Sequence, residues 1–405
     1  MGETPFPVNP YRPAAGHEPP FLAGRDQEKQ DFEKLLAQSV ITDNLILSGL
    51  RGVGKTVLLN HMKPIAQGCG WLWAGEDLTE QASLKEERIV TRIMTDLASL
   101  LGPIFVTETP AAPMGFNTPR ERNPLGYDDL DAVYRETPGL VGDKLKSVLR
   151  YVGGIIKDTE IKGIVFAYDE AQNLSDHSAK EEFPLSLLLD VFQSLQRQPD
   201  NLPFMLVLTG LPTLFPKLIA ARTYSERMFH TIFLDRLSDN DSRDAVIKPL
   251  EKMGNAFGFT DETVELIVKY AGGYPYFIQF ICKESFDILS AKLLTSEKPS
   301  VSMDLILRKL DQDFFSARWG KATDKQRVFL SVIARLPNCE KEFTAGEIIA
   351  KSEALLDKAY NRSNTSRFLK LLSDAGLLYK NSRGKYQFAV PMLSGFISRW
   401  IDSRG

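Results

Sequence analysis

The chain of 405 residues is 43% hydrophobic and 25% charged, which is ordinary for a globular protein of two or three domains. No apolar run approaches the ~20 residues that cross a bilayer. The first 20 residues are rich in proline but lack the apolar core of a secretory signal. The three cysteines (Cys69, Cys282 and Cys339) lie far apart, without the spacing of a metal site. These features argue against a membrane segment and predict reduced thiols in a cytoplasmic protein.

The first regular elements predicted along the chain are a helix and a buried strand. After an irregular leader over residues 1–20, a helix is predicted over residues 27–38, because its apolar residues fall on one face. The apolar run at 44–48 predicts a buried strand, and residues 57–62 predict the start of a second helix.

A glycine-rich loop connects this strand to the second helix. Its residues match the pattern G-x-x-x-x-G-K-T and are Gly49, Leu50, Arg51, Gly52, Val53, Gly54, Lys55 and Thr56. The glycines let successive backbone N–H groups turn inward around phosphate oxygens, and the helix N-terminus adds a partial positive charge. Lys55 is expected to reach the β- and γ-phosphates, and the Thr56 hydroxyl to ligate Mg²⁺. The pattern between strand and helix therefore predicts a site for ATP or ADP with Mg²⁺.

Predicted strands and helices alternate from this loop to residue 237. The further strands are predicted at 71–74, 164–168, 204–208 and 231–234, and the further helices at 84–101, 139–157 and 185–195. The run at 164–168 is continuously apolar, as expected at the centre of a parallel sheet. Residues 102–139 contain six prolines and little periodicity, which predicts a long surface insertion. The alternation predicts an α/β fold with a parallel sheet.

Two carboxylates, Asp169 and Glu170, directly follow the strand predicted at 164–168. A carboxylate at the C-terminal end of a parallel strand lies in the crevice where ligands bind. Asp169 is therefore predicted to hold Mg²⁺, directly or through water, and Glu170 to orient and polarise the attacking water. The alternative is a carboxylate that caps the next helix.

The C-terminal part of the chain is predicted to be helical and then basic. Residues 238–310 have a helical pattern, and from residue 323 three helices precede a hairpin, an order typical of a winged helix. From Gly320 onward, fifteen Lys and Arg stand against eight Asp and Glu, although the whole chain has a net charge of −3. This balance indicates an anionic partner or an ordinary fluctuation in surface charge. The basic residues around the third helix and the hairpin are Lys358, Arg362, Arg367, Lys370, Lys380, Arg383 and Lys385.

Together these segments resemble the AAA+ ATPases, and within them the initiator-like branch of origin-recognition ATPases, transposition regulators and archaeal-type ATPases. The resemblance covers residues 20–405 and rests on the entry loop at 21–25, the phosphate loop, the segments 169–172 and 208–212, the Gly273-Tyr274-Pro275 motif and the terminal winged helix. It implies an α/β nucleotide-binding core over residues 21–237, a helical lid over 238–319 and a winged-helix domain over 320–405.

The resemblance also implies roles for residues that sense or complete the site. Thr209 is similar to the polar residue that senses the γ-phosphate, and the alternative is a strand-end threonine bonded to its own backbone. Arg227 is similar to an arginine finger that reaches the ATP of a neighbouring subunit. Arg222 is the second candidate for that role, and a plain surface arginine is the alternative.

The adenine pocket is expected from the resemblance to be lined by backbone around Leu22 and Ala23 and by Pro275. The helix after Pro275 departs from the family pattern, because it has no arginine where many AAA+ proteins carry a second sensor. Slow, weakly lid-coupled hydrolysis is therefore expected.

The predicted function is an ATP-hydrolysing switch whose nucleotide state controls assembly and partner binding. The predicted assembly is an ATP-dependent homo-oligomer. The winged helix is predicted to bind duplex DNA or RNA mainly through phosphates, with protein contact or a structural cap as alternatives. Two other functions stay open. One is a signalling or defence scaffold that stores ADP and assembles on ATP, and the other is a nucleotide-binding adaptor with negligible turnover.

Overall fold

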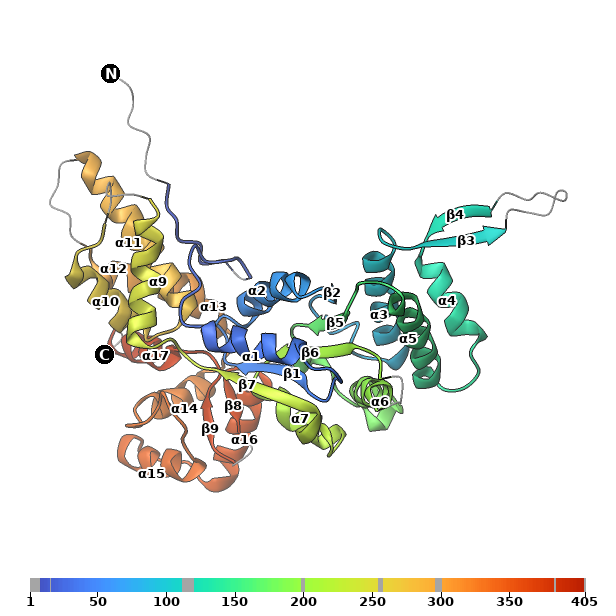
Figure 1. The fold of residues 1–405 in the computed structure, drawn as a ribbon. Helices are drawn as coiled ribbons and strands as arrows, with labels where there is room; N and C mark the ends of the chain where they lie inside the picture. Colours follow the sequence, from blue (N-terminus) through green and yellow to red (C-terminus); the bar gives the residue numbers. More distant parts are fainter. Residues whose placement is uncertain are drawn as a thin grey trace, which may run out of the picture. The chain divides into compact units, whose positions relative to one another are not determined.

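The computed structural model describes residues 8–14, 16–110, 120–197, 201–253, 258–295, 301–381 and 384–403 (Figure 1). The chain forms two compact units that alternate along the sequence. The sheet unit comprises residues 26–48 and 58–233, and the helical unit comprises residues 1–25, 49–57 and 234–405. The phosphate loop therefore belongs to the same unit as the segments after residue 234. The domain boundaries expected from the resemblance stay predictions.

The sheet unit is built on a five-stranded sheet. In spatial order the strands are β2 (Trp71–Ala74), β5 (Gly163–Tyr168), β6 (Phe204–Gly210), β1 (Asn44–Gly49) and β7 (Phe229–Leu234). β2 pairs with β5, β5 with β6 and β6 with β1, and all three pairings are parallel. The predicted α/β fold with a parallel sheet is confirmed. Because parallel strands run in one direction, the C-terminal ends of β5, β6 and β1 lie at one edge of the sheet.

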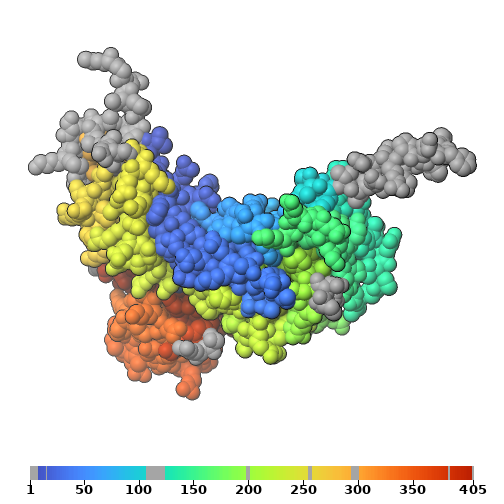
Figure 2. All heavy atoms as spheres, in the orientation of Figure 1, coloured from blue at the N-terminus to red at the C-terminus, as the bar shows by residue number. Residues whose placement is uncertain are grey.

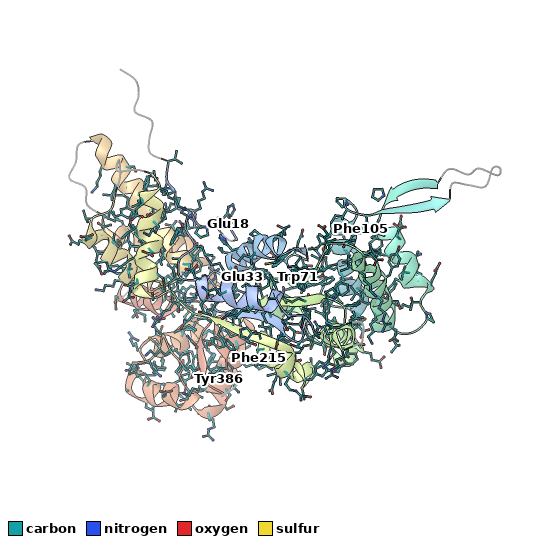
Figure 3. The ribbon with its side chains drawn as sticks, in the orientation of Figure 1. Glu18, Glu33, Trp71, Phe105, Phe215 and Tyr386 are labelled. Atoms are coloured by element: carbon teal, nitrogen blue, oxygen red, sulfur yellow. The ribbon has the colours of Figure 1, made fainter. Side chains whose placement is uncertain are left out.

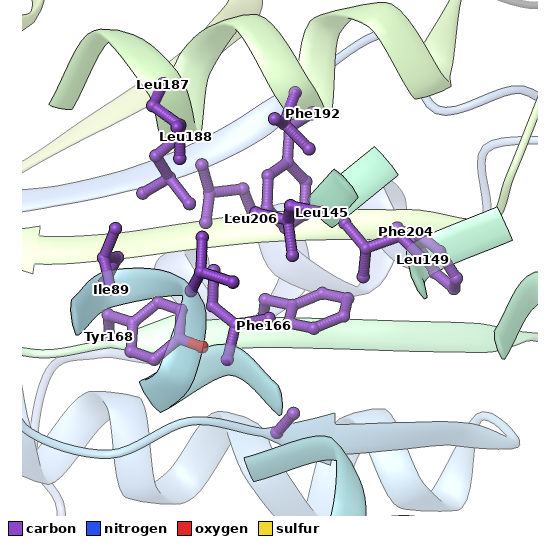
Figure 4. Packing of buried hydrophobic residues seen from close by; sticks show 14 of the residues in the cluster. Ile89, Leu145, Leu149, Phe166, Tyr168, Leu187, Leu188, Phe192, Phe204 and Leu206 are labelled. Atoms are coloured by element: carbon purple, nitrogen blue, oxygen red, sulfur yellow. The ribbon is translucent and has the colours of Figure 1, made fainter. Parts of the chain in front are cut away.

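The core of this unit forms between the sheet and helices α3 (Glu86–Leu101), α5 (Val141–Lys157) and α6 (Pro184–Gln196). Every residue of β5 and β6 is buried, as expected for strands of a parallel sheet. Phe166 of β5 packs edge-on against Phe192 of α6 and Phe204 of β6, with ring centroids 5.2 and 5.5 Å apart (Figure 4). This packing fixes the strands whose ends carry the candidate site.

The structure differs from the predicted surface insertion over residues 102–139. Part of this segment forms β3 (Val106–Pro110), β4 (Arg120–Pro124) and α4 (Tyr127–Glu136), while residues 111–119 lie outside the described residues. Leu125 and Leu130 are fully buried in the core of the sheet unit, and Tyr134 is 7% exposed. Leu130 and Tyr134 lie four residues apart, so they form a short apolar stripe on α4 that the neighbouring aspartates obscure in the sequence.

Several shorter elements complete the chain up to residue 234. They are α1 (Asp26–Leu36), α2 (Lys55–Gly68), the 3-10 turns η1 (Ala171–Asn173) and η2 (Ser178–Lys180), α7 (Leu214–Ala221) and α8 (Ser225–Met228). Phe215 of α7 packs edge-on against Phe233 of the edge strand β7, with ring centroids 6.4 Å apart (Figure 3).

The helical unit continues after β7 with α9 (Asp239–Glu251), α10 (Asp261–Ala271), α11 (Pro275–Thr295) and α12 (Met303–Leu310). Side chains of Ser238 and Thr260 accept the backbone N–H of the third residue of α9 and α10 respectively, which explains where these helices begin. A π-helical turn, η3 (Asp311–Phe315), then leads directly into α13 (Ser316–Gly320). The helical pattern predicted for 238–310 is confirmed.

The C-terminal segment contains the predicted order of three helices and a hairpin. These are α14 (Asp324–Ala334), α15 (Ala345–Leu355), α16 (Arg362–Asp374), and the antiparallel strands β8 (Leu378–Lys380) and β9 (Tyr386–Phe388). Tyr386 also exchanges two backbone hydrogen bonds of 2.8 Å with Phe343, which adds a third short strand-like segment (Figure 3). A further helix, α17 (Leu393–Asp402), was not predicted. In Figure 2, α14 and α15 form a rounded orange lobe.

The leader is anchored on α9 and α11 despite having no regular structure. Tyr11 is 2% exposed, its hydroxyl donates to the carbonyl oxygen of Val246 at 2.5 Å, and its ring packs on Phe286 with centroids 6.5 Å apart. Asn9 donates to the carbonyl oxygen of Lys283 at 2.9 Å. Throughout the described ranges, no helix is both long and apolar enough to cross a membrane.

Candidate nucleotide-binding site

The phosphate loop has the backbone conformation that its glycines permit. Gly52 and Gly54 have φ angles of 80° and 91°, and α2 begins at Lys55. These conformations are open to glycine and strained for other residues. A side chain at Gly49 would also collide with the protein, since its Cβ would lie 2.6 Å from the carbonyl oxygen of Leu234. The Lys55 ammonium donates to the carbonyl oxygens of Gly49 and Leu50 at 3.0 and 2.9 Å.

The entry loop supports the phosphate loop through Arg25. This arginine is 6% exposed, and its guanidinium donates to the carbonyl oxygens of Val53 at 3.1 Å and Asp235 at 2.7 Å. A buried guanidinium that bonds main-chain oxygens fixes the shape of the loop it touches. Ala23, which precedes it by two residues, is buried, and Leu22 is half-buried. Nothing in the sequence indicated that Arg25 contacts Asp235, which lies 210 positions away.

The Gly273-Tyr274-Pro275 motif and the residue after it also contact the phosphate loop. The backbone N–H of Tyr276 donates to the carbonyl oxygen of Gly52 at 3.3 Å. A Cβ at Gly54 would lie 3.9 Å from Pro275 Cγ. Gly273 has a φ of 78°, and its carbonyl oxygen accepts the N–H of Leu237 at 2.7 Å. Within the helical unit, the first turn of α11 therefore lies against the loop, and the expected place of Pro275 in the adenine pocket stays a prediction.

The end of β5 in the sheet unit carries Asp169 and Glu170. Asp169 is 3% exposed, its carboxylate accepts the N–H of Glu170 at 2.7 Å, and its carbonyl oxygen accepts the N–H of Leu78 at 2.9 Å. Glu170 is exposed and has φ 52° and ψ 31°, in the left-handed region. Non-glycine residues adopt this conformation rarely, and such residues are enriched at functional sites.

Thr209 lies near the end of β6, in register with Leu47 of β1. Its side chain is fully buried, and among the described residues its hydroxyl has no hydrogen-bond partner. The neighbouring Ser48 of β1 has the same status. A buried hydroxyl without a partner costs about 1–3 kcal/mol, so it calls for a ligand or a water molecule. The arrangement therefore does not match the alternative in which Thr209 bonds its own backbone.

Known structures share the fold over nearly the whole chain. The Walker-type ATPase PABY2304 of Pyrococcus abyssi is 15% identical in sequence, and its match has a TM-score of 0.57 and covers 93% of this chain and 96% of that one. The ORC2 protein of Aeropyrum pernix, solved as ADPNP–ADP complexes, is 14% identical with a TM-score of 0.52 and 97% of each chain covered. The chain has the fold of these two proteins.

A comparison with protein-family models gives one match. A family model described as a domain of unknown function (DUF8462) matches residues 312–397, from the π-helical turn into α17. A comparison with curated protein sequences finds no match.

The two arginines expected from the resemblance as finger candidates differ in their surroundings. Arg222 forms a two-pronged ion pair with Asp190, at 2.8 and 2.5 Å, and Tyr224 donates to the same carboxylate at 2.6 Å. Arg227 is exposed on α8, and its side chain makes no hydrogen bond or ion pair within the described ranges. The structure thus gives Arg222 a structural partner and leaves Arg227 accessible.

Arg318 faces the phosphate loop from a place that the sequence did not indicate. It lies over the ring of Phe314 at 4.1 Å and donates to that residue's carbonyl oxygen at 2.6 Å. Phe314 in turn packs on Tyr276, with centroids 5.0 Å apart. Burial, and then the nearby positive charge of Arg51, lower the pKa of Arg318. Neither arginine pairs with a carboxylate in the described part of the chain, so together they form a site attractive to anions.

The helix after Pro275 is where the resemblance would place a second arginine, and it has none there. Arg318 instead follows the π-helical turn of residues 311–315. An added residue in a helical turn shifts the direction of the side chains after it, and such turns are frequent at functional sites. The sequence signal was weak, because a π-helical turn has no simple residue pattern.

The residues present suit Mg²⁺ as a ligand shared with a nucleotide. Mg²⁺ prefers oxygen ligands and is usually bound by one or two protein groups together with substrate phosphates. The hydroxyl of Thr56 and the carboxylate of Asp169 are such donors. No group of three or more His, Cys, Asp and Glu in the described ranges forms a metal site by itself.

The basic residues of the C-terminal segment divide into free and paired side chains. Arg362, Arg367 and Lys370 are exposed on α16, as is Lys358 just before it, and none of them pairs with a carboxylate in the residues that the structure describes. Lys385 of the hairpin lies 3.5 Å from Glu342, and Lys380 lies over the Tyr386 ring at 5.6 Å. Arg383 lies outside the described residues.

Proposed function

We propose that the chain is an ATPase switch that binds ATP on the phosphate loop, hydrolyses it and changes partner binding with its nucleotide state. The observation that carries the proposal is the loop itself. Two glycines with positive φ and a helix that starts at Lys55 form a cradle of backbone N–H groups. The fold supports this proposal, because the similar ORC2 protein was solved as ADPNP–ADP complexes and in an ADP form.

Binding would depend mainly on groups of the helical unit. The ammonium of Lys55 would pair with the β- and γ-phosphates. Arg25 would stabilise the loop conformation through its hydrogen bond to the carbonyl oxygen of Val53. Leu22, Ala23 and Pro275 would line the adenine pocket. Thr56 and Asp169 would hold Mg²⁺, which when bound neutralises charge on the phosphate oxygens.

Hydrolysis would depend on groups at the strand ends of the sheet unit. Glu170 would accept a proton from the attacking water, and the hydroxyl of Thr209 would hydrogen-bond the γ-phosphate or that water. Arg227 would supply positive charge to the ATP of a neighbouring subunit, so the proposal includes an ATP-dependent homo-oligomer.

The test separates binding from turnover. Lys55→Ala is expected to weaken ATP binding by at least tenfold in calorimetric titration, because a charged partner of the phosphates is lost. Glu170→Gln is expected to retain ATP binding and lower turnover by about a hundredfold or more, because shape is kept and the base is removed. Lys63→Ala, on the exposed side of the same helix α2, is the control and should change neither. Wild-type turnover in Glu170→Gln would contradict the mechanism.

Two outcomes would favour the alternative functions. Tightly co-purifying ADP with assembly on ATP would favour a signalling or defence scaffold. Nucleotide binding without measurable turnover in the wild-type protein would favour an adaptor.

A second candidate function is binding of duplex DNA by the C-terminal segment. The observation that favours it is the exposed basic face of α16, where Arg362, Arg367 and Lys370 have no carboxylate partner among the described residues. Such residues bind phosphates without reading sequence. An acidic protein surface could bind the same basic residues. Absence of DNA binding by the wild-type protein at 50 mM salt would favour that alternative.

A further inference from the structure

Gln172 joins the chain after β5 to the chain after β6. Its side-chain Nε2 donates to the Glu170 carboxylate, and its Oε1 accepts the backbone N–H of Leu211 at 3.0 Å. Leu211 directly follows β6 and comes two residues after Thr209. One amide group therefore links the candidate base to the strand end that carries the candidate phosphate sensor.

The surroundings hold this amide in place. A Cβ at Gly210 would lie 2.7 Å from Gln172 Oε1, so the absence of a side chain at Gly210 permits the contact. The carbonyl oxygen of Gln172 accepts the ammonium of Lys217 at 2.6 Å, and Lys217 also donates to Ser175 Oγ at 2.9 Å. Burial lowers the pKa of Lys217, as expected for an ammonium that bonds neutral oxygens. Gln172 is thus fixed from both its side chain and its main chain.

Glu170 needs such a partner to be an effective base. Its side chain is exposed, and a free glutamate side chain samples many rotamers. Gln172 holds one carboxylate oxygen, Oε2, whereas Oε1 makes no hydrogen bond within the described residues. The held oxygen sets the direction of the carboxylate, and the other stays available to accept a proton.

We propose that Gln172 is a positioning residue for ATP hydrolysis, which orients the Glu170 carboxylate and makes its orientation depend on the position of the chain after β6. This inference rests on the proposed ATPase function. It implies that a displacement at Thr209, where a phosphate would be sensed, is transmitted through Leu211 and Gln172 to the base.

The test compares two substitutions that keep the length of the side chain. Gln172→Met removes both side-chain hydrogen bonds. Gln172→Glu retains an oxygen that accepts from Leu211 but removes the donor to Glu170. Both are expected to lower kcat by about tenfold or more, because displacement of a catalytic group by about 1 Å has effects of this order or larger. The dissociation constant for ATP, measured by calorimetric titration, is expected to stay within twofold of the wild-type value.

A double variant shows whether Gln172 acts through Glu170. If it does, Glu170→Gln combined with Gln172→Met is expected to be no slower than Glu170→Gln alone, because residues that act as one unit are non-additive. Gln193→Met is the matched control. Gln193 is a half-buried glutamine of α6, in the same unit, whose side chain makes no hydrogen bond within the described residues, and its kcat should be unchanged. Thermal melting of every variant identifies loss of fold, and Gln172→Glu serves if Gln172→Met does not fold.

The outcomes separate this inference from the function on which it rests. Wild-type kcat in both folded Gln172 variants, with Glu170→Gln inactive, would overturn the positioning role alone. A full further loss in the double variant would also overturn it, because Gln172 would then act independently of Glu170. Absence of turnover in the wild-type protein, or wild-type turnover in Glu170→Gln, would overturn the proposed hydrolysis and the role of Gln172 together.

Discussion

Four arginines of the two units differ in whether their side chains are already paired. Arg25 and Arg222 are held, one by main-chain oxygens and the other by Asp190. Arg227 and Arg318 have no carboxylate partner in the described part of the chain. An arginine whose guanidinium is already bonded to protein oxygens stabilises the local fold. An arginine without a carboxylate partner is available to bind a phosphate group.

The accessibility of Arg227 leads to a prediction about subunits acting together. We expect Arg227→Ala to lower turnover by on the order of a thousandfold at assembling concentrations, because an arginine finger has effects of this size. Mixing Arg227→Ala with Glu170→Gln should restore part of the activity, since each subunit supplies the group that the other lacks. Turnover of the wild-type protein should rise faster than linearly with protein concentration.

Arg222→Ala is the control for that experiment. Because Asp190 already holds Arg222, its loss is expected to lower the melting temperature slightly and to leave turnover per folded molecule near the wild-type value. Activity strictly proportional to protein concentration, with no recovery in the mixture, would leave a monomeric switch and exclude a finger role for Arg227.

Among the elements, α16 has two faces with different partners. Thr365, Phe368, Leu369 and Leu372 are buried on one face, where Phe368 stacks on Phe329 of α14 with centroids 5.1 Å apart. The other face carries exposed basic residues. The apolar face therefore fixes the helix, and the basic face stays available to a polyanion.

This division predicts a specific salt dependence of DNA binding. The wild-type protein should bind labelled duplex DNA in fluorescence anisotropy at 50 mM salt with ATP, and weaken steeply as salt rises. Replacing Arg362, Arg367 and Lys370 by alanine should reduce the slope of log K against log salt by about 2.7, at about 0.9 per phosphate contact. The sequence preference should not change, because phosphate contacts carry no sequence information.

A control with the same change in charge keeps this prediction specific. Lys63, Lys157 and Lys180 are exposed in other parts of the chain, and their replacement by alanine should leave the slope within one of the wild-type value. No DNA binding by the wild-type protein at 50 mM salt would favour contact with an acidic protein instead.

At the level of the whole molecule, the helical unit is assembled from segments far apart in sequence. Tyr11 of the leader bonds Val246 and packs on Phe286, and Gly16 passes close to Thr56, whose Cγ2 would lie 3.6 Å from a Cβ at that glycine. The leader therefore connects α9 and α11 with the neighbourhood of the phosphate loop. Its contribution to stability is expected to be large for a segment without regular structure.

The buried side chain of Tyr11 makes this contribution measurable. Tyr11→Ala should lower the free energy of unfolding by about 3 kcal/mol or more, because a large buried ring is removed. Tyr11→Phe, which loses only the hydroxyl, should lower it by about 1 kcal/mol. Val8→Ala is the control, since Val8 is 79% exposed and should have little effect. Equal denaturation midpoints for Tyr11→Ala and wild type would show that the leader is not docked in solution.

The sequence by itself determined the features that depend on neighbouring residues. The phosphate loop could be predicted because its conformation follows from consecutive glycines between a strand and a helix. The strands at 164–168 and 204–208 could be predicted because continuous apolar runs suit a sheet covered on both faces. Asp169 and Glu170 could be placed at a sheet edge for the same reason. The buried part of residues 102–139 was harder, because Leu130 and Tyr134 stand among aspartates.

Only the tertiary structure decided which distant residues meet. Arg25 reaches Asp235, Gln172 reaches Leu211, and Arg318 reaches the neighbourhood of Arg51, over 210, 39 and 267 positions. Arg222 and Arg227 were both candidates for the finger role, and only the structure shows that Asp190 holds Arg222. Such pairings depend on how strands and helices pack, and packing energy is spread over many apolar contacts that identify no single partner in advance. The phosphate loop therefore depends on consecutive residues, whereas the residues that support it come from distant parts of the sequence.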